Sequence, residues 1–262
     1  MEKHATLRVE ERPENVLLVT LDRPEVANAF NTQSALELDG AFRRIGSERR
    51  HRCIVLTGAG DRAFCAGADL KERASLSEEQ WLGQHEIFER MFRSVLDCPA
   101  PVLAAVNGAA YAGGLELALM CDFAYASQTA RFALTEVSLG IMPGGGGTQT
   151  LARAAGERRA KELILSARPF SAEEALAWGV VNKLCEPGKL LEETLEAARR
   201  IASRAPLSVA QARRAIRDGL QTDLASGLKL EIEAYHRLVG TEDRREGIRA
   251  FNEKRKPSFK GR

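Results

Sequence analysis

The sequence lacks the features that mark exported, zinc-binding or membrane-spanning proteins. Its five cysteines (Cys53, Cys65, Cys98, Cys121 and Cys185) are odd in number and form no C-x-x-C pair, which argues against a disulfide framework or a zinc site. No apolar run approaches the length of a membrane span, and residues 1–9 mix charges among apolar residues, unlike a signal peptide. We therefore expect a cytoplasmic protein with reduced thiols, or a mitochondrial-matrix protein if a transit peptide has been trimmed.

An excess of charge of one sign is also missing. The chain of 262 residues has 38 Lys and Arg against 36 Asp and Glu, a formal net charge of +2. This balance gives no global reason to expect nucleic acid or an acidic membrane surface as a partner. The 44% hydrophobic and 28% charged composition is ordinary for a soluble globular domain. Any anion-binding site must therefore be formed by a small group of neighbouring residues, because the net charge of the whole chain does not provide one.

The first two thirds of the chain alternate predicted strands and helices. Short, apolar, β-branched runs predict buried strands, and a helical spacing of apolar residues predicts a helix over 32–46. Ser75 and Glu78 offer a capping box for a second helix that runs to about residue 96. This strand, crossover, strand order predicts an α/β protein with a parallel sheet. The predicted strands are 16–21, 53–57, 102–106, 123–126 and 180–184.

From residue 190 the pattern becomes helical only. The predicted helices are 190–203, 207–218, 224–239 and 241–254. No low-complexity linker precedes them, so we expect a core over 1–189 and a helical C-terminal oligomerisation region over 190–262. Such a tail either packs on the sheet or docks on another subunit.

Two glycine-rich segments resemble nucleotide loops only in their letters. Residues 58–63 read GAGDRA and fit G-x-G-x-x-A, but small residues follow instead of the helix start that would receive a pyrophosphate. Residues 144–147 are all glycine, but no lysine precedes Thr148, which argues against a P-loop. We expect the second segment to be a turn before a helix that begins near Gln149.

Two other small-residue turns lie beside two unusual glutamates. The turns are residues 66–69 and 112–114, and the second directly precedes a predicted helix over 115–120. Free N–H groups in such turns and at a helix start are natural donors to an oxyanion. Glu116 and Glu136 each stand among apolar neighbours. A favourable interaction with the helix dipole is an alternative explanation for Glu116. Together, however, two carboxylates near backbone donors favour proton transfer next to a stabilised enolate.

At these residues the sequence resembles the enoyl-CoA hydratase/isomerase (crotonase) superfamily. The matching segments are DRAFCAGADLK at 61–71, AAVNGAAYAGGLELALMCD at 104–122, and 136–149 with IMPGGGGTQ at 141–149. The resemblance covers nearly the whole chain. It implies a spiral of β-β-α units with an all-helical C-terminal region that supports homotrimers or dimers of trimers.

The resemblance also implies roles for individual residues. The N–H groups of Ala68 and Gly113 would form the oxyanion hole, and Glu116 and Glu136 match the two catalytic glutamates of the hydratases. We assign the base that activates water to Glu116 and the acid to Glu136. Further positions match those that hold coenzyme A, together with Ala68 and Gly113: Val26, Ala27, Ala66, Asp69, Leu70, Lys71 and, near the C-terminus, Phe251 and Lys254.

The implied activity is reversible syn addition of water to a trans-2-enoyl-CoA, giving a 3-hydroxyacyl-CoA in fatty-acid or branched-chain amino-acid degradation. No cofactor is expected, because coenzyme A is part of the substrate. The segments 65–74 and 113–119 look especially like the methylglutaconyl-CoA hydratase branch, so that activity is one alternative. Δ3-Δ2 enoyl-CoA isomerisation is another, and RNA binding on this fold a third. The RNA-binding interpretation would use the basic cluster Arg43, Arg44, Arg49, Arg50 and Arg52.

Two positions depart from the family pattern. Ala112 replaces a frequent glycine, which leaves Gly113 intact as a donor. Thr135 stands where many relatives have proline, and we expect this change to alter the acyl pocket more than the chemistry.

Overall fold

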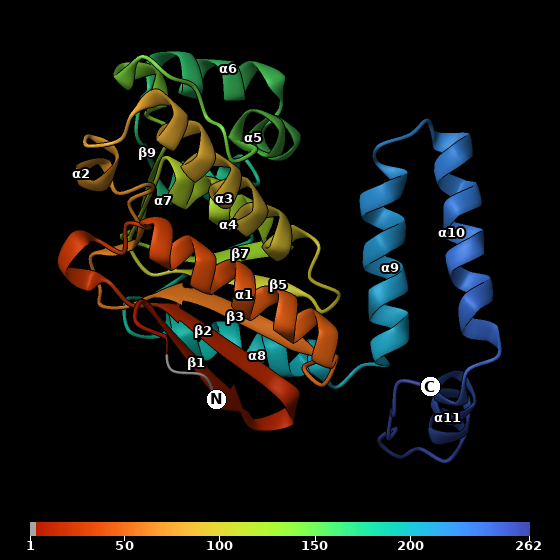
Figure 1. The fold of residues 1–262 in the computed structure, drawn as a ribbon. Helices are drawn as coiled ribbons and strands as arrows, with labels where there is room; N and C mark the ends of the chain where they lie inside the picture. Colours follow the sequence, from red (N-terminus) through yellow and green to blue (C-terminus); the bar gives the residue numbers. More distant parts are fainter. Residues whose placement is uncertain (1–3) are drawn as a thin grey trace.

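The computed structural model describes residues 4–262 and contains two mixed sheets (Figure 1). The larger sheet has six strands in the order β1-β2-β3-β5-β7-β10. Only β1 is antiparallel to its neighbour, because it forms a hairpin with β2. The bounds are β1 Leu7–Arg12, β2 Val16–Leu21, β3 Cys53–Gly58, β5 Val102–Val106, β7 Phe123–Ser127 and β10 Lys183–Cys185.

The smaller sheet is built from strands of two or three residues. Its order is β4-β6-β8-β9, with the first three parallel and β9 antiparallel to β8. The bounds are β4 Ala63–Cys65, β6 Ala109–Tyr111, β8 Arg131–Ala133 and β9 Phe170–Ser171.

Successive units of the chain contribute one strand to each sheet and then a helix. The units are β3, β4 and α3, then β5, β6 and α4, then β7, β8 and α5. This repetition is the expected β-β-α spiral, so the prediction of an α/β fold with C-terminal helices is confirmed. The helices of this part are α1 Thr32–Glu48, α2 Leu70–Arg73, α3 Glu78–Leu96, α4 Gly113–Met120, α5 Gly147–Ala155, α6 Glu157–Ser166 and α7 Ala172–Ala177.

Both faces of the large sheet are covered, which explains why its strands read as continuous apolar runs. All six residues of β2 and of β3 are buried. One face packs with α1, α3 and α4 around large side chains such as Phe42, Ile54 and Met91. The other face is covered by α8 Leu190–Ala202, through Leu190, Leu195 and Ala198. The first helix of the predicted tail therefore packs on the sheet.

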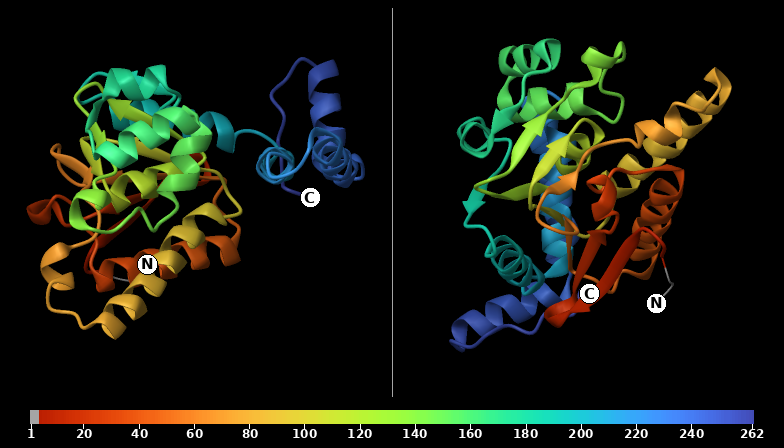
Figure 2. Two further views of the ribbon diagram at one scale, coloured as in Figure 1. Left: turned by 90° about the horizontal axis from the view of Figure 1, so that it is seen from above. Right: turned by 90° about the vertical axis from the view of Figure 1, so that its left-hand side faces the viewer.

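The last three helices stand beside this body rather than on it. They are α9 Pro206–Gly219, α10 Leu224–Val239 and α11 Glu242–Asn252. Figures 1 and 2 show α9 and α10 as an antiparallel pair joined to the body by the segment after α8. No residue of α9 is buried, and in α10 only Ala234 is. The predicted division at residue 190 stays a prediction.

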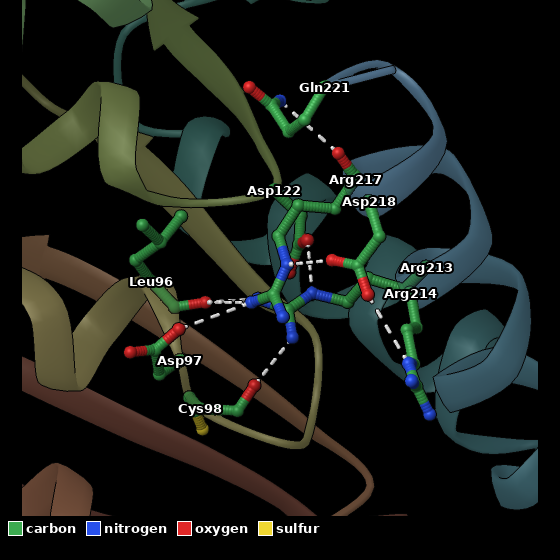
Figure 3. A network of polar contacts seen from close by, with 9 residues as sticks. All are labelled: Leu96, Asp97, Cys98, Asp122, Arg213, Arg214, Arg217, Asp218 and Gln221. Atoms are coloured by element: carbon green, nitrogen blue, oxygen red, sulfur yellow. Dashed lines mark hydrogen bonds and ion pairs between the residues drawn. The ribbon is translucent and has the colours of Figure 1, made fainter. Parts of the chain in front are cut away.

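Two arginines of α9 tie the pair to the body (Figure 3). Arg213 donates from Nε to Asp122, from Nη1 to the carbonyl of Cys98 (2.6 Å) and from Nη2 to the carbonyl of Leu96 (2.9 Å). Arg217 lies 3.3 Å from a carboxylate oxygen of Asp97. Planar guanidinium groups with several acceptors fix orientation as well as distance, so this network sets how α9 leaves the body.

Most predicted elements agree with the structure to within a few residues, but three expectations need correction. The helix to Leu96 begins at Glu78, and its capping box is Ser77 with Gln80 instead of Ser75 with Glu78. The strand predicted over 180–184 is Lys183–Cys185. We also expected a loop from residue 61 to about residue 73, and this segment contains β4 and α2. No helix among residues 4–262 is long and apolar enough to cross a membrane.

Candidate active site

A cavity of ≈ 530 Å³ lies where α2, α3, α4 and the loop after β8 meet. Both glutamates line it, and so do Ala68 and Gly113. The sequence-predicted catalytic and oxyanion residues are therefore brought together, although 20 residues separate Glu116 from Glu136 in the chain. A larger hollow of ≈ 890 Å³ between the body and α9 contains neither glutamate.

Glu116 lies in the first turn of α4 and is held by a distant loop. The helix can start close to the smaller sheet because Gly114 has no side chain: a Cβ there would lie 1.9 Å from the carbonyl oxygen of Cys65. Glu116 is 3% exposed, and its Oε1 accepts hydrogen bonds of 2.8 Å from the N–H groups of Gly145 and Gly147. Burial raises the pKa of Glu116, and these two N–H groups counteract part of the rise.

Glu136 opens the short 3-10 helix Glu136–Leu139 after β8, and its environment is different. The residue is 7% exposed, and its Oε2 is buried without a hydrogen-bond partner in the part of the chain that the structure describes. Burial above all, with the charge of Glu116 as a smaller cause, raises the pKa of Glu136 to about 7. The carboxyl group is therefore ready to hold a proton near neutral pH and has an oxygen free for a ligand or water.

The two small-residue turns present backbone N–H groups to the same cavity. The backbone of Phe30 forms hydrogen bonds on both sides of Ala68. Its N–H donates to the carbonyl of Gly67, and its carbonyl accepts from the N–H of Asp69, both at 2.9 Å. The N–H groups of Ala68 and Gly113 donate no hydrogen bond to any of residues 4–262. A Cβ on Gly67 would lie 3.2 Å from the nitrogen of Gly113, so the two turns are adjacent. Adjacent unpaired N–H groups can polarise a carbonyl oxygen bound between them.

The glycine run at 144–147 has a role that the sequence did not reveal. We expected only a turn, and α5 does begin at Gly147, but the run also supplies both donors that hold Glu116. A Cβ on Gly145 would lie 2.3 Å from Cε2 of Phe92 and 2.8 Å from Oε2 of Glu116. The absence of a side chain at Gly145 therefore lets the loop approach the carboxylate. The contact spans about thirty residues of sequence, and no local pattern indicates it.

Some of the residues expected to hold coenzyme A in the N-terminal half line the cavity, and the others lie in segments next to these. Ala66 and Leu70 line the cavity, and Leu70 is half exposed. The short helix that contains Val26 precedes Ala27, whose carbonyl accepts from the N–H of Ala66 (3.0 Å). The loop of Val26 and Ala27 is thus beside the first turn.

Asp69 is the N-cap residue of α2, and Lys71 lies in the first turn of this helix. Asp69 caps α2 by accepting from the N–H of Lys71, and it forms an ion pair of 3.0 Å with Arg23. Burial acts to raise the pKa of Asp69, but the hydrogen bond from Arg23 and the backbone bonds outweigh it and lower the pKa. Lys71 is exposed. Asp69 therefore has structural partners of its own, and Lys71 remains free to meet a ligand.

The two C-terminal positions are not brought to the cavity of their own chain. Phe251 lies near the end of α11 and is 84% exposed, and Lys254 is exposed two residues after that helix. Figure 1 places α11 at the far end of the α9–α10 pair from α2. A contact of Phe251 or Lys254 with a neighbour's ligand stays a prediction.

The basic cluster is largely engaged in internal contacts. Arg43 pairs with Asp39 at 2.8 Å, and Arg50 pairs with Glu11 and Glu48 at 3.0 and 2.9 Å. Arg52 donates to the carbonyls of Ala202 and Phe259. The described part of the chain also contains no group of three or more His, Cys, Asp or Glu side chains arranged to hold a metal ion. All five cysteines are buried and free.

Comparison with known proteins gives one consistent result. The sequence profile of the family described as enoyl-CoA hydratase/isomerase matches residues 11–262. A short-chain-enoyl-CoA hydratase from Clostridium acetobutylicum is 40% identical over 253 residues, 96% of this chain and 97% of that one. A mitochondrial methylglutaconyl-CoA hydratase from Mus musculus is 36% identical over 257 residues, 97% of this chain and 82% of that one. The crystal structure of an enoyl-CoA hydratase from Bacillus anthracis superposes with a TM-score of 0.96 at 43% identity, covering 98% of this chain and 100% of that one.

Proposed function

The chain belongs to the enoyl-CoA hydratase/isomerase family, and we propose that it adds water reversibly and syn to a trans-2-enoyl-CoA, giving a 3-hydroxyacyl-CoA. The observation that carries this proposal is the convergence of two buried carboxyl groups on one cavity beside two unpaired backbone N–H groups. Hydration needs both a base for water and an acid for the carbon, so a pair of glutamates supports it more directly than isomerisation by one.

The proposed cycle starts at the thioester carbonyl. It accepts hydrogen bonds from Ala68 N–H and Gly113 N–H, which draws electron density from the double bond onto oxygen. Each donor contributes about 3 kcal/mol in the transition state. The donors are backbone groups already fixed by Phe30 and by the start of α4, so little reorganisation accompanies the reaction.

The two glutamates divide the elements of water. Glu116 removes a proton from water as the water oxygen forms a bond to Cβ. Glu136 delivers a proton to Cα of the resulting enolate. Oε1 of Glu116 is held by two N–H groups, which favours the charged form that a base needs. The raised pKa of Glu136, about 7, favours the protonated form that an acid needs. After the reaction Glu116 carries the proton taken from water and Glu136 is ionised. Proton exchange with solvent then returns both carboxyl groups to their starting states.

We extend the proposal to assembly as a homotrimer or a dimer of trimers. The α9–α10 pair exposes apolar side chains that a soluble monomer would leave in water: Ile216, Leu220, Leu224, Leu228, Ile232 and Tyr235 are each more than half exposed. A second and third copy of the chain would cover them. Mass measurement by light scattering at micromolar concentration tests this, and a monomer would refute it.

The test of the activity is the ultraviolet absorbance of the conjugated thioester in crotonyl-CoA. We expect the wild type to remove this absorbance, and Glu116→Gln and Glu136→Gln each to slow its removal by roughly 10² to 10⁴. Glu86→Gln, on the exposed side of α3, is the matched control and should leave the rate unchanged. A folded wild type that is inert on every 2-enoyl-CoA offered would refute the proposal. A gain of conjugated absorbance from a 3-enoyl-CoA, without hydration, would indicate isomerisation instead.

A further inference from the structure

Ala112, the residue before the proposed donor Gly113, has a backbone conformation that is unfavourable for a residue with a side chain. Its φ is +49° and its ψ is −127°. Turns give this combination of angles to glycine, because a Cβ crowds the neighbouring peptide groups there. Ala27, Arg49 and Ala167 also have a positive φ, but their ψ values of 37°, 21° and 24° lie near the left-handed helical region that other residues tolerate. Strain such as that of Ala112 persists only where the surrounding structure enforces it, and it concentrates at functional sites.

Hydrogen bonds on both sides fix the backbone of Ala112. Its N–H donates to the carbonyl of Ala133, at the end of β8, at 2.8 Å. Its carbonyl accepts from the N–H groups of Leu115 and Glu116, in the first turn of α4, at 3.0 and 3.1 Å. The N–H of Gly113 belongs to the same peptide group as this carbonyl, and in a trans peptide the two point in opposite directions. The carbonyl is directed into α4, so the N–H of Gly113 is directed away from the helix, and the ψ angle of Ala112 sets that direction.

The methyl group of Ala112 lies between the two small-residue turns. A Cβ on Gly67 would lie 3.0 Å from Cβ of Ala112, so the methyl group lies next to Cα of Gly67. Gly67 precedes Ala68 in the chain, just as Ala112 precedes Gly113. The methyl group therefore separates the two residues that come directly before the two donors. The pairing of β4 with β6, the strands that lead into these turns, opposes a wider separation.

We propose that Ala112 is a positioning residue for the oxyanion hole, because its side chain fixes the separation of the N–H groups of Ala68 and Gly113. This inference rests on the proposed hydratase function. A carbonyl oxygen that accepts from both donors needs each of them about 3 Å away at the same time. Glycine at position 112 would adopt the same φ and ψ without strain, but it would leave a methyl-sized gap beside Gly67 and a freer ψ angle. The alanine therefore weakens the fold slightly and improves the geometry of the donors.

The test substitution is Ala112→Gly, which relieves the strain and removes the methyl group from the intact protein. With crotonyl-CoA we expect kcat to fall roughly 5- to 50-fold, less than the roughly 10²- to 10³-fold loss that removal of a whole oxyanion donor causes. KM should stay within about twofold, because the donors act mainly on the transition state. The melting temperature should be no lower than that of the wild type. A residue that only supported the fold would not lower kcat while it left the stability intact.

A spectroscopic measurement separates an effect on the donors from an effect on the glutamates. Cinnamoyl-CoA has a conjugated carbonyl, and its absorbance band moves to longer wavelength when hydrogen bonds polarise that carbonyl. We expect bound cinnamoyl-CoA to show this shift in the wild type and a smaller shift in Ala112→Gly. Both variant and wild type retain Glu116 and Glu136, so a smaller shift reports on the two N–H groups.

Ala167→Gly is the matched control, because Ala167 has φ +51° at the end of α6 and does not line the cavity. It also replaces an alanine of positive φ by glycine, and it should leave kcat and the shift unchanged. An unchanged kcat in Ala112→Gly would overturn the inference. A fall in kcat without a smaller shift, or with a lower melting temperature, would overturn it as well.

The wild type distinguishes failure of the inference from failure of the proposed function. A wild type that is inert on every 2-enoyl-CoA offered and gives no shift with cinnamoyl-CoA refutes the hydratase proposal and the inference with it. An active wild type, together with an Ala112→Gly variant that behaves in the same way, refutes the inference alone.

Discussion

Replacing Glu136 by glutamine should remove activity and at the same time stabilise the protein in alkaline solution. The carboxyl group has an ordinary pKa of 4.5, and burial in the folded chain raises the pKa to about 7. The folded state therefore binds this proton more tightly than the unfolded chain does. Between pH 4.5 and pH 7 the free energy of unfolding falls as pH rises, and the whole loss is present above about pH 7.

The size of this loss follows from the two pKa values. The difference between the two pKa values corresponds to about 3 kcal/mol of unfolding free energy, and water in the open cavity makes the actual loss smaller. We therefore expect Glu136→Gln to raise the free energy of unfolding by about 1 to 3 kcal/mol at pH 8. Near pH 4 both states of the wild type are protonated, and the gain should vanish.

The assay is urea unfolding of wild type and variant at pH 8 and near pH 4, at one protein concentration because assembly also contributes to stability. Glu86→Gln, which alters an exposed glutamate, serves as the control and should show no gain at either pH. A Glu136→Gln variant that is no more stable than the wild type at pH 8 would refute the argument that ionised Glu136 destabilises the folded protein. An equal increase in unfolding free energy at both pH values would refute it too.

Three further predictions concern the same region. Gly145→Ala places a Cβ against Phe92 and Glu116 and should lower kcat more than tenfold. The far-ultraviolet circular dichroism spectrum should stay that of the wild type. An unchanged kcat would mean that the loop does not orient the carboxylate of Glu116. Ala112 has φ +49°, which glycine adopts without strain, so Ala112→Gly should raise the unfolding free energy by about 1 kcal/mol, and a lower melting temperature would contradict this. The profile of kcat/KM against pH should decline above about pH 7 as Glu136 loses its proton, and a rate still rising at pH 9 would exclude Glu136 as the acid.

The elements that the sequence predicted well are those whose burial is visible in local composition. β2 and β5 are apolar on both faces, and their bounds agree with the prediction. β1 reads LRVEER, with charges that lie at a sheet edge, and was not predicted. β4 and β6 have three residues each, too few for a periodic pattern, and exist because they pair with each other across 45 and 46 residues of sequence.

The site was predictable only where a residue is unusual in its own segment. Glu116 and Glu136 are such residues, because carboxylates rarely stand within apolar runs. Gly145 and Gly147 looked like a turn, since their contact with Glu116 depends on how distant segments meet. Arg73 lies in a segment with Lys71 and Glu72 that reads as solvated, and only the packing of α2 against Trp81 reveals that its charge is buried.

The proposed assignment of Glu116 as base and Glu136 as acid rests on the different surroundings of two chemically identical side chains. Glu116 accepts two backbone hydrogen bonds on Oε1, which favour its anion, whereas Oε2 of Glu136 has no hydrogen-bond partner among residues 4–262. Burial is the main cause that raises the pKa of Glu136 to about 7, and the charge of Glu116 is a smaller cause in the same direction. A site with one base and one acid at neutral pH is what addition of water to a double bond requires. The glycine run at 144–147 therefore supports the proposed base, because its two N–H groups counteract part of the rise that burial causes in the pKa of Glu116.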